Sequence, residues 1–296
     1  MKVMVTFNRD LVDDCARRKV IVFVGSGVSA GVKTRSGQHM RDWEGFLRHA
    51  AGLINSTIDK KIVEELLLSK DYIMACEIIK SSLDENSWNN LVYEEFSKVG
   101  LVSDLHKSIA SLDQRITLTT NFDKLLESTF QDASTGTHYP ITISNLSEEV
   151  FHILRDDKKY IIKIHGTVDS PTSMIFAKTD YAKKAFSNWA YSEFIGTLLV
   201  SYTFLFVGFS MNDPAISLLV ERYAQKFPNA RPHYILQPSP INSRFRDVSK
   251  NLRKLYVIEY DPIDNHKNLA LTIDALAEVT VARRREILAE ELRAMR

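Results

Sequence analysis

The sequence predicts an α/β protein with a Rossmann-like, doubly wound parallel sheet. Two observations carry this prediction. Short apolar segments of strand length alternate with amphipathic segments of helix length, and the first apolar segment runs directly into a glycine-rich turn. Strands that are buried on both faces of a parallel sheet are continuous apolar runs of this kind. Polar residues follow several of these runs, where a sheet of this class binds its ligand.

The chain opens with a predicted helix and a predicted central strand. Residues Asn8 to Lys19 place Leu11 and Cys15 on one helical face. Val20–Val24 consists only of β-branched and aromatic apolar residues, so we expect a fully buried strand. The stretch 33–40 that follows the glycine turn is polar and is predicted to be irregular.

Between Arg41 and about Gly100 no predicted strand interrupts a run of helical periodicity. Apolar residues recur at helical spacing in the segments Arg41–Leu53, Ile62–Leu68, Tyr72–Ile79 and Leu91–Phe96. We therefore predict a helical insertion at about residues 41–100, inside a single domain that spans residues 1–296.

The alternation of helix and strand resumes after the insertion, with a helix over Leu101–Leu112. The predicted strands are Arg115–Thr119, Tyr160–Ile164, Phe204–Val207, His233–Leu236 and Leu255–Tyr260. The predicted helices begin at Asn121, lie within Thr179–Val200 and Pro214–Gln225, and form a C-terminal segment at about residues 265–296, with Asp132–Tyr139 as a loop. The last helix carries the cluster Arg283–Arg285, which we expect to be exposed.

Composition is that of an ordinary soluble globular protein, and we expect the chain to act in the cytoplasm. Its net charge of +1 gives no general attraction to nucleic acid or to a membrane surface, so we predict neither as a partner. Cys15 and Cys76, the two cysteines, are expected to be buried thiols, and two cysteines cannot form a zinc site of the four-cysteine type. The N-terminus lacks a signal-peptide pattern, and the apolar stretch Phe194–Phe209 is too short to span a membrane.

The turn Gly25-Ser-Gly-Val-Ser-Ala30 matches the pattern G-x-G-x-x-A after a strand. In that pattern the first glycine permits a tight turn, the second allows close approach of a ligand, and the small final residue keeps a helix near the strand. We expect a helix N-terminus here that binds a pyrophosphate. The absence of a following Gly-Lys-Ser/Thr excludes a Walker A loop.

Three further strand ends carry polar residues, and each has a purely structural alternative. Thr120 or Asn121 could cap the next helix, and Asp123 suits the positive end of a helix dipole. His165, before a glycine, could be a turn residue. Asp213-Pro214 matches a helix cap followed by proline, and Ser210 could be an ordinary loop residue. Because parallel strands end at one edge of a sheet, we nevertheless expect these groups to share one crevice.

Together the motifs resemble those of the sirtuin (SIR2) family, and in particular its SIR2-like branch in prokaryotic antiphage defence. The residues that carry the resemblance, in the family's order and spacing, are Gly25-Ser-Gly-Val-Ser-Ala-Gly31, Thr120-Asn-Phe-Asp123, Lys163-Ile-His-Gly166 and Val207-Gly-Phe-Ser210. The resemblance covers about residues 20–214.

The resemblance implies a site that binds NAD as substrate and cleaves its nicotinamide–ribose bond. By position, Gly25, Ser26, Gly27, Ser29 and Ala30 hold the pyrophosphate side. Thr120, Asn121 and Asp123 hold the nicotinamide ribose, with Asn121 and His165 as the catalytic residues. Gly208, Ser210 and Asp213 contact the adenosine half.

Two departures from the deacylating sirtuins direct the choice of reaction. The two C-x-x-C zinc pairs are missing, and so is the G-I-P-x-F-R segment. We therefore expect hydrolysis of NAD to nicotinamide and ADP-ribose, without zinc. An NAD-dependent protein deacylase or ADP-ribosyltransferase, and a non-catalytic sensor of NAD or ADP-ribose, are the alternatives. Because a free NADase would harm its host, we also expect control by a homo-oligomer or by a partner such as a HerA-like ATPase or an Argonaute.

Overall fold

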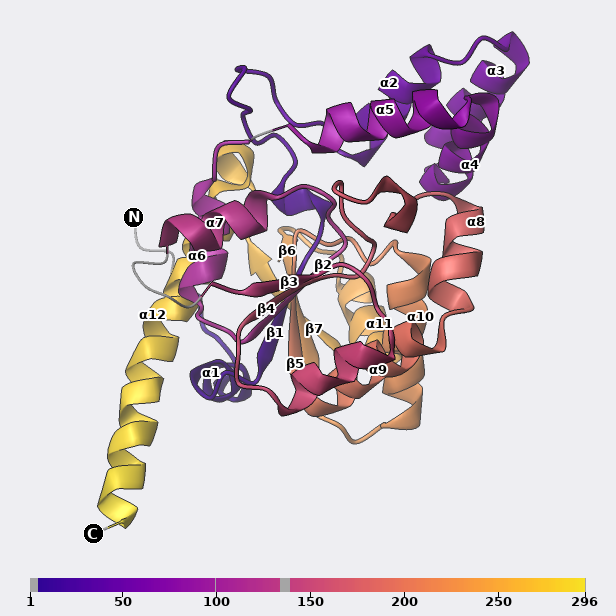
Figure 1. Cartoon of the computed structure of the whole chain (residues 1–296). Helices are drawn as coiled ribbons and strands as arrows, with labels where there is room; N and C mark the ends of the chain where they lie inside the picture. Colours follow the sequence, from indigo (N-terminus) through magenta and orange to yellow (C-terminus); the bar gives the residue numbers. More distant parts are fainter. Residues whose placement is uncertain (1–4, 99, 134–138, 296) are drawn as a thin grey trace.

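The computed structural model describes residues 5–98, 100–133 and 139–295 and contains one seven-stranded sheet in the order β3-β4-β2-β1-β5-β6-β7. Every pairing between neighbouring strands is parallel, which confirms the predicted doubly wound α/β class (Figure 1). The strands are β1 Val20–Val24, β2 Ile116–Thr119, β3 Ile141–Ile143, β4 Tyr160–Lys163, β5 Thr203–Val207, β6 His233–Pro238 and β7 Leu255–Tyr260.

Strand β1 lies at the point where the winding of the sheet reverses. After β1 the chain forms β2, β3 and β4 on one side of it, and it later returns to form β5, which pairs with β1 on the other side. The loops after β1 and β5 therefore leave the same edge in opposite directions. In open α/β sheets a ligand binds in the crevice at this switch point.

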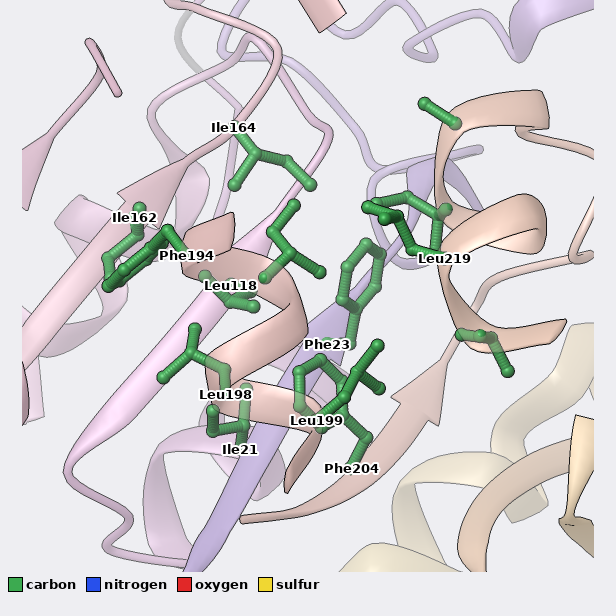
Figure 2. Packing of buried hydrophobic residues seen from close by; sticks show 14 of the residues in the cluster. Ile21, Phe23, Leu118, Ile162, Ile164, Phe194, Leu198, Leu199, Phe204 and Leu219 are labelled. Carbon is green, nitrogen blue, oxygen red and sulfur yellow. The ribbon is translucent and has the colours of Figure 1, made fainter. Parts of the chain in front are cut away.

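Alternate side chains of the central strand enter two separate hydrophobic cores. Ile21 and Phe23 point into a core with α9 (Trp189–Ser201) and α10 (Pro214–Lys226), as Figure 2 shows. Val20, Val22 and Val24 belong to the opposite core, which contains α1 (Arg9–Ala16), α6 (Asp104–Ser111) and part of α12 (Ile263–Ala294). Burial of both faces explains the uninterrupted apolar sequence of β1.

The predicted insertion is helical, as expected, and covers the carboxyl edge of the sheet. It comprises α2 Trp43–Gly52, α3 Thr57–Leu68, α4 Tyr72–Ser82 and α5 Glu85–Phe96. Its core includes Phe122, which follows β2, and Phe176, which follows β4; their rings stack with centroids 4.3 Å apart. The insertion is thereby packed onto the segments that leave the strands.

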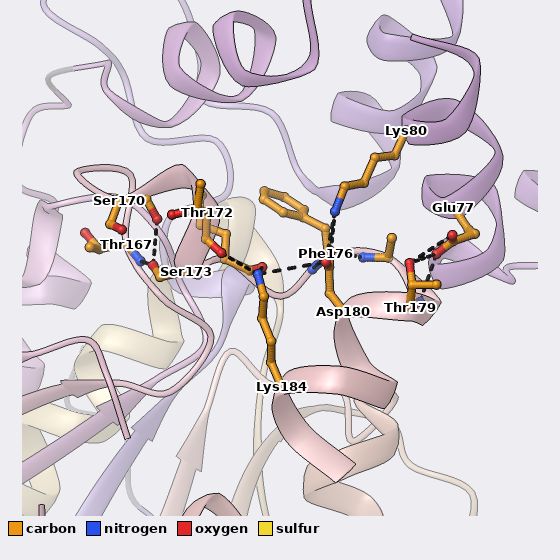
Figure 3. Close-up of polar contacts among 12 residues, drawn as sticks. Glu77, Lys80, Thr167, Ser170, Thr172, Ser173, Phe176, Thr179, Asp180 and Lys184 are labelled. Atoms are coloured by element: carbon orange, nitrogen blue, oxygen red, sulfur yellow. Dashed lines mark hydrogen bonds and ion pairs between the residues drawn. The ribbon is translucent and has the colours of Figure 1, made fainter. Parts of the chain in front are cut away.

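A partly buried ion pair and a set of exposed hydrogen bonds add to this packing (Figure 3). Lys80 of α4 approaches both carboxylate oxygens of Asp180, at 2.8 and 2.9 Å, and Glu77 of the same helix accepts hydrogen bonds from the backbone N–H and the hydroxyl of Thr179. Asp180 belongs to α8 (Lys178–Asp180), which continues into a π-helix over Tyr181–Phe186. The insertion and this π-helix therefore hold each other in place.

Several sequence predictions need correction. Helix α7, Leu125–Ala133, begins four residues after Asn121 and takes in Asp132, so the predicted loop 132–139 starts later, and its residues 134–138 lie outside the described structure. Strand β3, the 3₁₀ segment Glu148–Arg155 and α11 (Ser243–Arg253) were not predicted. They are short or strongly polar, and so they lack a clear apolar period.

The arginine cluster on α12 is also less exposed than predicted. The Arg283 side chain is 18% exposed and pairs with Asp13 of α1 at 2.6 Å. Arg284 donates to the carbonyl oxygen of Ala16 and pairs with Asp113 at 2.8 Å. Of the three arginines, only Arg285 is exposed to solvent. These arginines fasten α12 to the ends of α1 and α6. In the described residues, no helix is both long enough and apolar enough to cross a membrane.

Packing of α12 gives a stability test with a matched control on the same helix. Leu276 is 1% exposed in the core, whereas Leu288 is 57% exposed. We expect Leu276→Ala to lower the free energy of unfolding by about 2–5 kcal/mol, because it leaves a cavity. Leu288→Ala should change it by less than about 0.5 kcal/mol. Urea denaturation measures both, and equal losses would show that α12 is not docked as described.

Candidate active site

The glycines after β1 are required by the protein's own backbone. The Gly25 N–H donates to the Val207 carbonyl at 2.9 Å, and the Gly27 N–H donates to the Gly208 carbonyl at 3.0 Å. A Cβ on Gly25 would lie 2.4 Å from the Gly208 oxygen, and Gly208 itself has φ +60°. The close approach that we expected Gly27 to offer a ligand is therefore made by the β5 loop, and the two loops form one rigid unit.

The helix expected directly after the glycine turn is absent. Only a three-residue 3₁₀ turn, Ser26–Val28, follows β1, and α2 begins at Trp43. Gly31 has φ +73°, a left-handed conformation that ends the turn. Its N–H donates to the Met40 carbonyl, which closes the loop between these two residues. The turn leaves Ser26 and Gly27 exposed and Ala30 half-buried, so the surface available here is loop backbone, without a helix dipole.

Asn121 is buried beside this unit, and its amide is only half satisfied. Its Nδ2 donates to the Gly25 carbonyl and to Ser29 Oγ, each at 3.1 Å, while its Oδ1 is buried without a partner among the described residues. Asn121 does not cap the next helix. That role belongs to Asp123, whose Oδ1 accepts from the Leu125 N–H at 3.0 Å. A buried acceptor with no partner is costly, and it provides a place for a ligand hydroxyl or a water.

His165 follows β4 and is 3% exposed. Its Nε2 lies 3.2 Å from the Tyr191 hydroxyl and 3.4 Å from Asp213 Oδ2. Burial lowers the pKa of His165, and the nearby Asp213 carboxylate opposes that shift in part. The ring is therefore neutral near pH 7 and can accept a proton.

Asp213 serves two structural purposes at once. Its Oδ1 accepts from the Ile216 N–H at 2.9 Å, with Pro214 at the first helical position, which is the predicted capping arrangement. Its Oδ2 accepts from the Tyr181 hydroxyl at 2.6 Å and faces His165. A carboxylate in this place can orient an imidazole and stabilise it after it gains a proton.

The predicted residues thus form two neighbouring clusters. One contains Gly25, Ser29 and Asn121, and the other contains His165 and Asp213; among the described residues no hydrogen bond joins Asn121 to His165. They are close along the edge, because the Ile164 N–H donates to the Thr119 carbonyl at 3.0 Å. The structure places Thr120 half-buried at this edge and Ser210 exposed on the β5 loop.

Two tyrosines of the site were missed by sequence reasoning. Tyr181 lies on the π-helix and Tyr191 on α9, in a segment whose sequence shows only helical periodicity. No motif marks them. The pKa of each phenol is raised by burial, so both hydroxyls stay protonated and can donate toward Asp213 or His165. Only the tertiary structure shows that these tyrosines contact His165 and Asp213.

Fold and site together define a class: an open, doubly wound α/β protein with its polar groups gathered at the switch point, where such folds bind nucleotides. Residues 115–260 match the model of the SIR2-like domain. This match covers about half of the chain, over which the chain is similar to the SIR2-like family.

Curated proteins show similarity over most of this chain. NAD(+) hydrolase ThsA of Bacillus cereus is 27% identical over 78% of this chain and 45% of its own length. The ThsA of Acinetobacter baumannii is 26% identical over 76% of this chain and 44% of its own. Defense-associated sirtuin 2 of Bacillus subtilis is 20% identical over 79% of this chain and 22% of its own. The chain spans less than half the length of these relatives.

The close contact between the loops after β1 and β5 predicts how alanine at Gly25 changes the stability of the protein. Gly25→Ala should lower the free energy of unfolding by about 1–3 kcal/mol, because its Cβ meets backbone that cannot rotate away. Gly196→Ala, in the middle of α9 with no atom within 4 Å of the new Cβ, should instead raise it, by up to about 1 kcal/mol. Thermal melting distinguishes the two signs, and a neutral Gly25→Ala would contradict the close loop contact.

Proposed function

We propose that this chain hydrolyses NAD to nicotinamide and ADP-ribose. One observation carries the proposal: a neutral buried imidazole and an amide with an unfilled acceptor lie at neighbouring strand ends, beside the glycine turn. The relatives that are named NAD(+) hydrolase support the same reaction.

The reaction requires little acid catalysis, because nicotinamide leaves NAD as a neutral molecule. Positive charge grows on the ribose as the bond breaks, and a water then adds to that carbon. We assign to Asn121 the positioning of this water or of a ribose hydroxyl through Oδ1. His165 takes the proton that the water loses, and Asp213 stabilises the resulting imidazolium.

The predicted residues divide the dinucleotide among the loops after β1, β2 and β5. We assign the pyrophosphate to the turn formed by Gly25, Ser26, Gly27, Ser29 and Ala30. We assign the nicotinamide ribose to Thr120, Asn121 and Asp123, and the adenosine half to Gly208, Ser210 and Asp213. Asp123 and Asp213 already serve as helix caps, so any contact with NAD adds to a structural role.

Both catalytic groups are covered in this structure: Asn121 is 7% exposed and His165 is 3% exposed. Substrate entry therefore requires side chains to move, and Tyr181 and Tyr191, whose rings lie against His165, are the candidates on that side. A closed site fits an NADase of antiphage defence that acts only when triggered, in the cytoplasm, through homo-oligomerisation or a partner such as a HerA-like ATPase. The relative named Defense-associated sirtuin 2 supports the defence role.

Removal of either catalytic group tests the reaction. Asn121→Ala and His165→Ala should each lower the rate of nicotinamide release from NAD by about a hundredfold or more, as loss of a general base or of its water does. His152→Ala, which removes an exposed histidine, serves as the control and should keep full activity. Melting temperatures verify folding.

The same assay separates the alternative functions. Release of nicotinamide only when an acylated peptide or a protein acceptor is added would indicate a deacylase or an ADP-ribosyltransferase. Binding of ADP-ribose with no release under any condition would indicate a sensor. Unchanged hydrolysis in either alanine variant would remove that residue from the mechanism.

Asp213 gives a prediction about pH. Its charge raises the pKa of His165 against the effect of burial, so Asp213→Asn should lower that pKa further. The acid limb of kcat/KM then moves to lower pH, while the maximal rate falls because the imidazolium loses its partner. Asparagine still caps α10, which preserves folding. Asp169→Asn, at an exposed carboxylate paired with Lys124, should leave the profile unchanged. A limb that moved to higher pH would refute the assignment.

A further inference from the structure

A basic cavity opens at the edge of the sheet opposite the catalytic groups. It has a volume of about 550 Å³, and five of its nine lining residues are arginine or lysine. Drug-sized ligands occupy pockets of about 300–1,000 Å³. The chain as a whole has a net charge of only +1, so the cations are concentrated here.

Strand register explains the concentration. Lys19, Arg115 and Lys159 directly precede β1, β2 and β4, and Tyr202 directly precedes β5. These four strands are neighbours and run parallel, so the residues before them form a row along the amino edge. Arg17 and Arg18, at the end of α1, extend the row.

Part of this row is fixed in position by the protein. The Arg115 guanidinium donates to the Ile153 carbonyl at 2.8 Å and lies 5.6 Å from the centroid of the Tyr202 ring. Asp113 holds Arg18 at 2.5 Å and Lys159 at 2.6 Å. Burial opposes ionisation of Asp113, yet hydrogen bonds from Lys159 and Arg18 lower its pKa to about 2. The carboxylate therefore stays charged and keeps both cations in place.

Positive charge remains after these pairs are counted. Lys19 has no side-chain partner among the described residues, and Arg17 reaches Glu291 only at 3.8 Å. The carboxyl ends of α1 and α9 add about half a negative charge each. Asp157 is the acidic residue of the lining. The cations outweigh these groups, so the cavity favours an anion. Tyr202 and Leu154 provide an apolar wall beside them.

We propose that this cavity binds a nucleoside polyphosphate, with its phosphates on Lys19, Arg17 and Lys159 and its base against Tyr202. The site is separate from the catalytic one, since Arg115 and Asn121 lie at opposite ends of β2. A phosphate needs multiple cationic donors, and a base needs a flat or apolar surface; the cavity offers both. A ligand bound in this cavity would contact the residues that directly precede β1, β2, β4 and β5.

Direct binding by calorimetry to the full chain tests the proposal, with ATP and inorganic pyrophosphate as probes. We expect both to bind, and ATP to bind more tightly because only it has a base. Lys19→Gln should weaken binding about tenfold, the equivalent of one charge-assisted contact. Lys159→Gln is a second variant with the same expectation. Lys61→Gln, at an exposed lysine of α3, is the matched control and should bind normally.

The outcomes separate this proposal from the proposed NADase. Lys19→Gln should hydrolyse NAD at the normal rate, and Asn121→Ala should bind ATP normally. The proposal is wrong if neither probe binds at millimolar concentration, or if Lys19→Gln binds ATP as well as the unmodified chain. It is also wrong if an oligonucleotide displaces ATP and binds far more tightly, since the edge would then be a nucleic-acid surface.

Discussion

Direct backbone contact between the loops after β1 and β5 is the constraint on which the site depends. The strands are adjacent and parallel, so both loops leave the sheet at the same place. They can lie against each other only because Gly25 and Gly208 have no Cβ at the contact. The Gly25 carbonyl then points to Asn121 and holds its amide beside the turn. In the phosphate-binding loops of other Rossmann folds, glycine allows the backbone to approach the ligand closely. In this protein the glycines allow the loops after β1 and β5 to approach each other.

The helical insertion completes the carboxyl edge. Phe122 lies between Asn121 and Asp123 in the sequence, and its ring is buried with Phe176 under the insertion. Its neighbour Asn121 is buried as well and is hydrogen-bonded to the glycine turn after β1. The short segment 121–123 therefore contributes both an aromatic ring to the core of the insertion and a hydrogen-bonded amide to the end of β2.

The two edges of the sheet differ in their polar groups. At the carboxyl edge, burial keeps His165 neutral, and Asp213 is bonded to Tyr181 and to the N-terminus of α10. At the amino edge, lysine and arginine lead the strands and are held by Asp113. The parallel arrangement separates these sets, because every strand contributes its first residue to one edge and its last to the other. A substrate and an anionic ligand could therefore bind without sharing any residue.

The sequence by itself determined every described strand except the short β3, most helices, and the positions of the polar residues at strand ends. These depend on local periodicity and on the neighbours of each residue, so Val20–Val24 and the insertion were predictable. Only the tertiary structure decided which partners these residues have. It joined Gly208 to Gly25, turned Asp213 toward His165, brought Tyr181 and Tyr191 to the site, and paired the half-buried Arg283 with Asp13. Those contacts join residues far apart in the chain, and neither periodicity nor spacing encodes them, because they depend on strand order and helix docking.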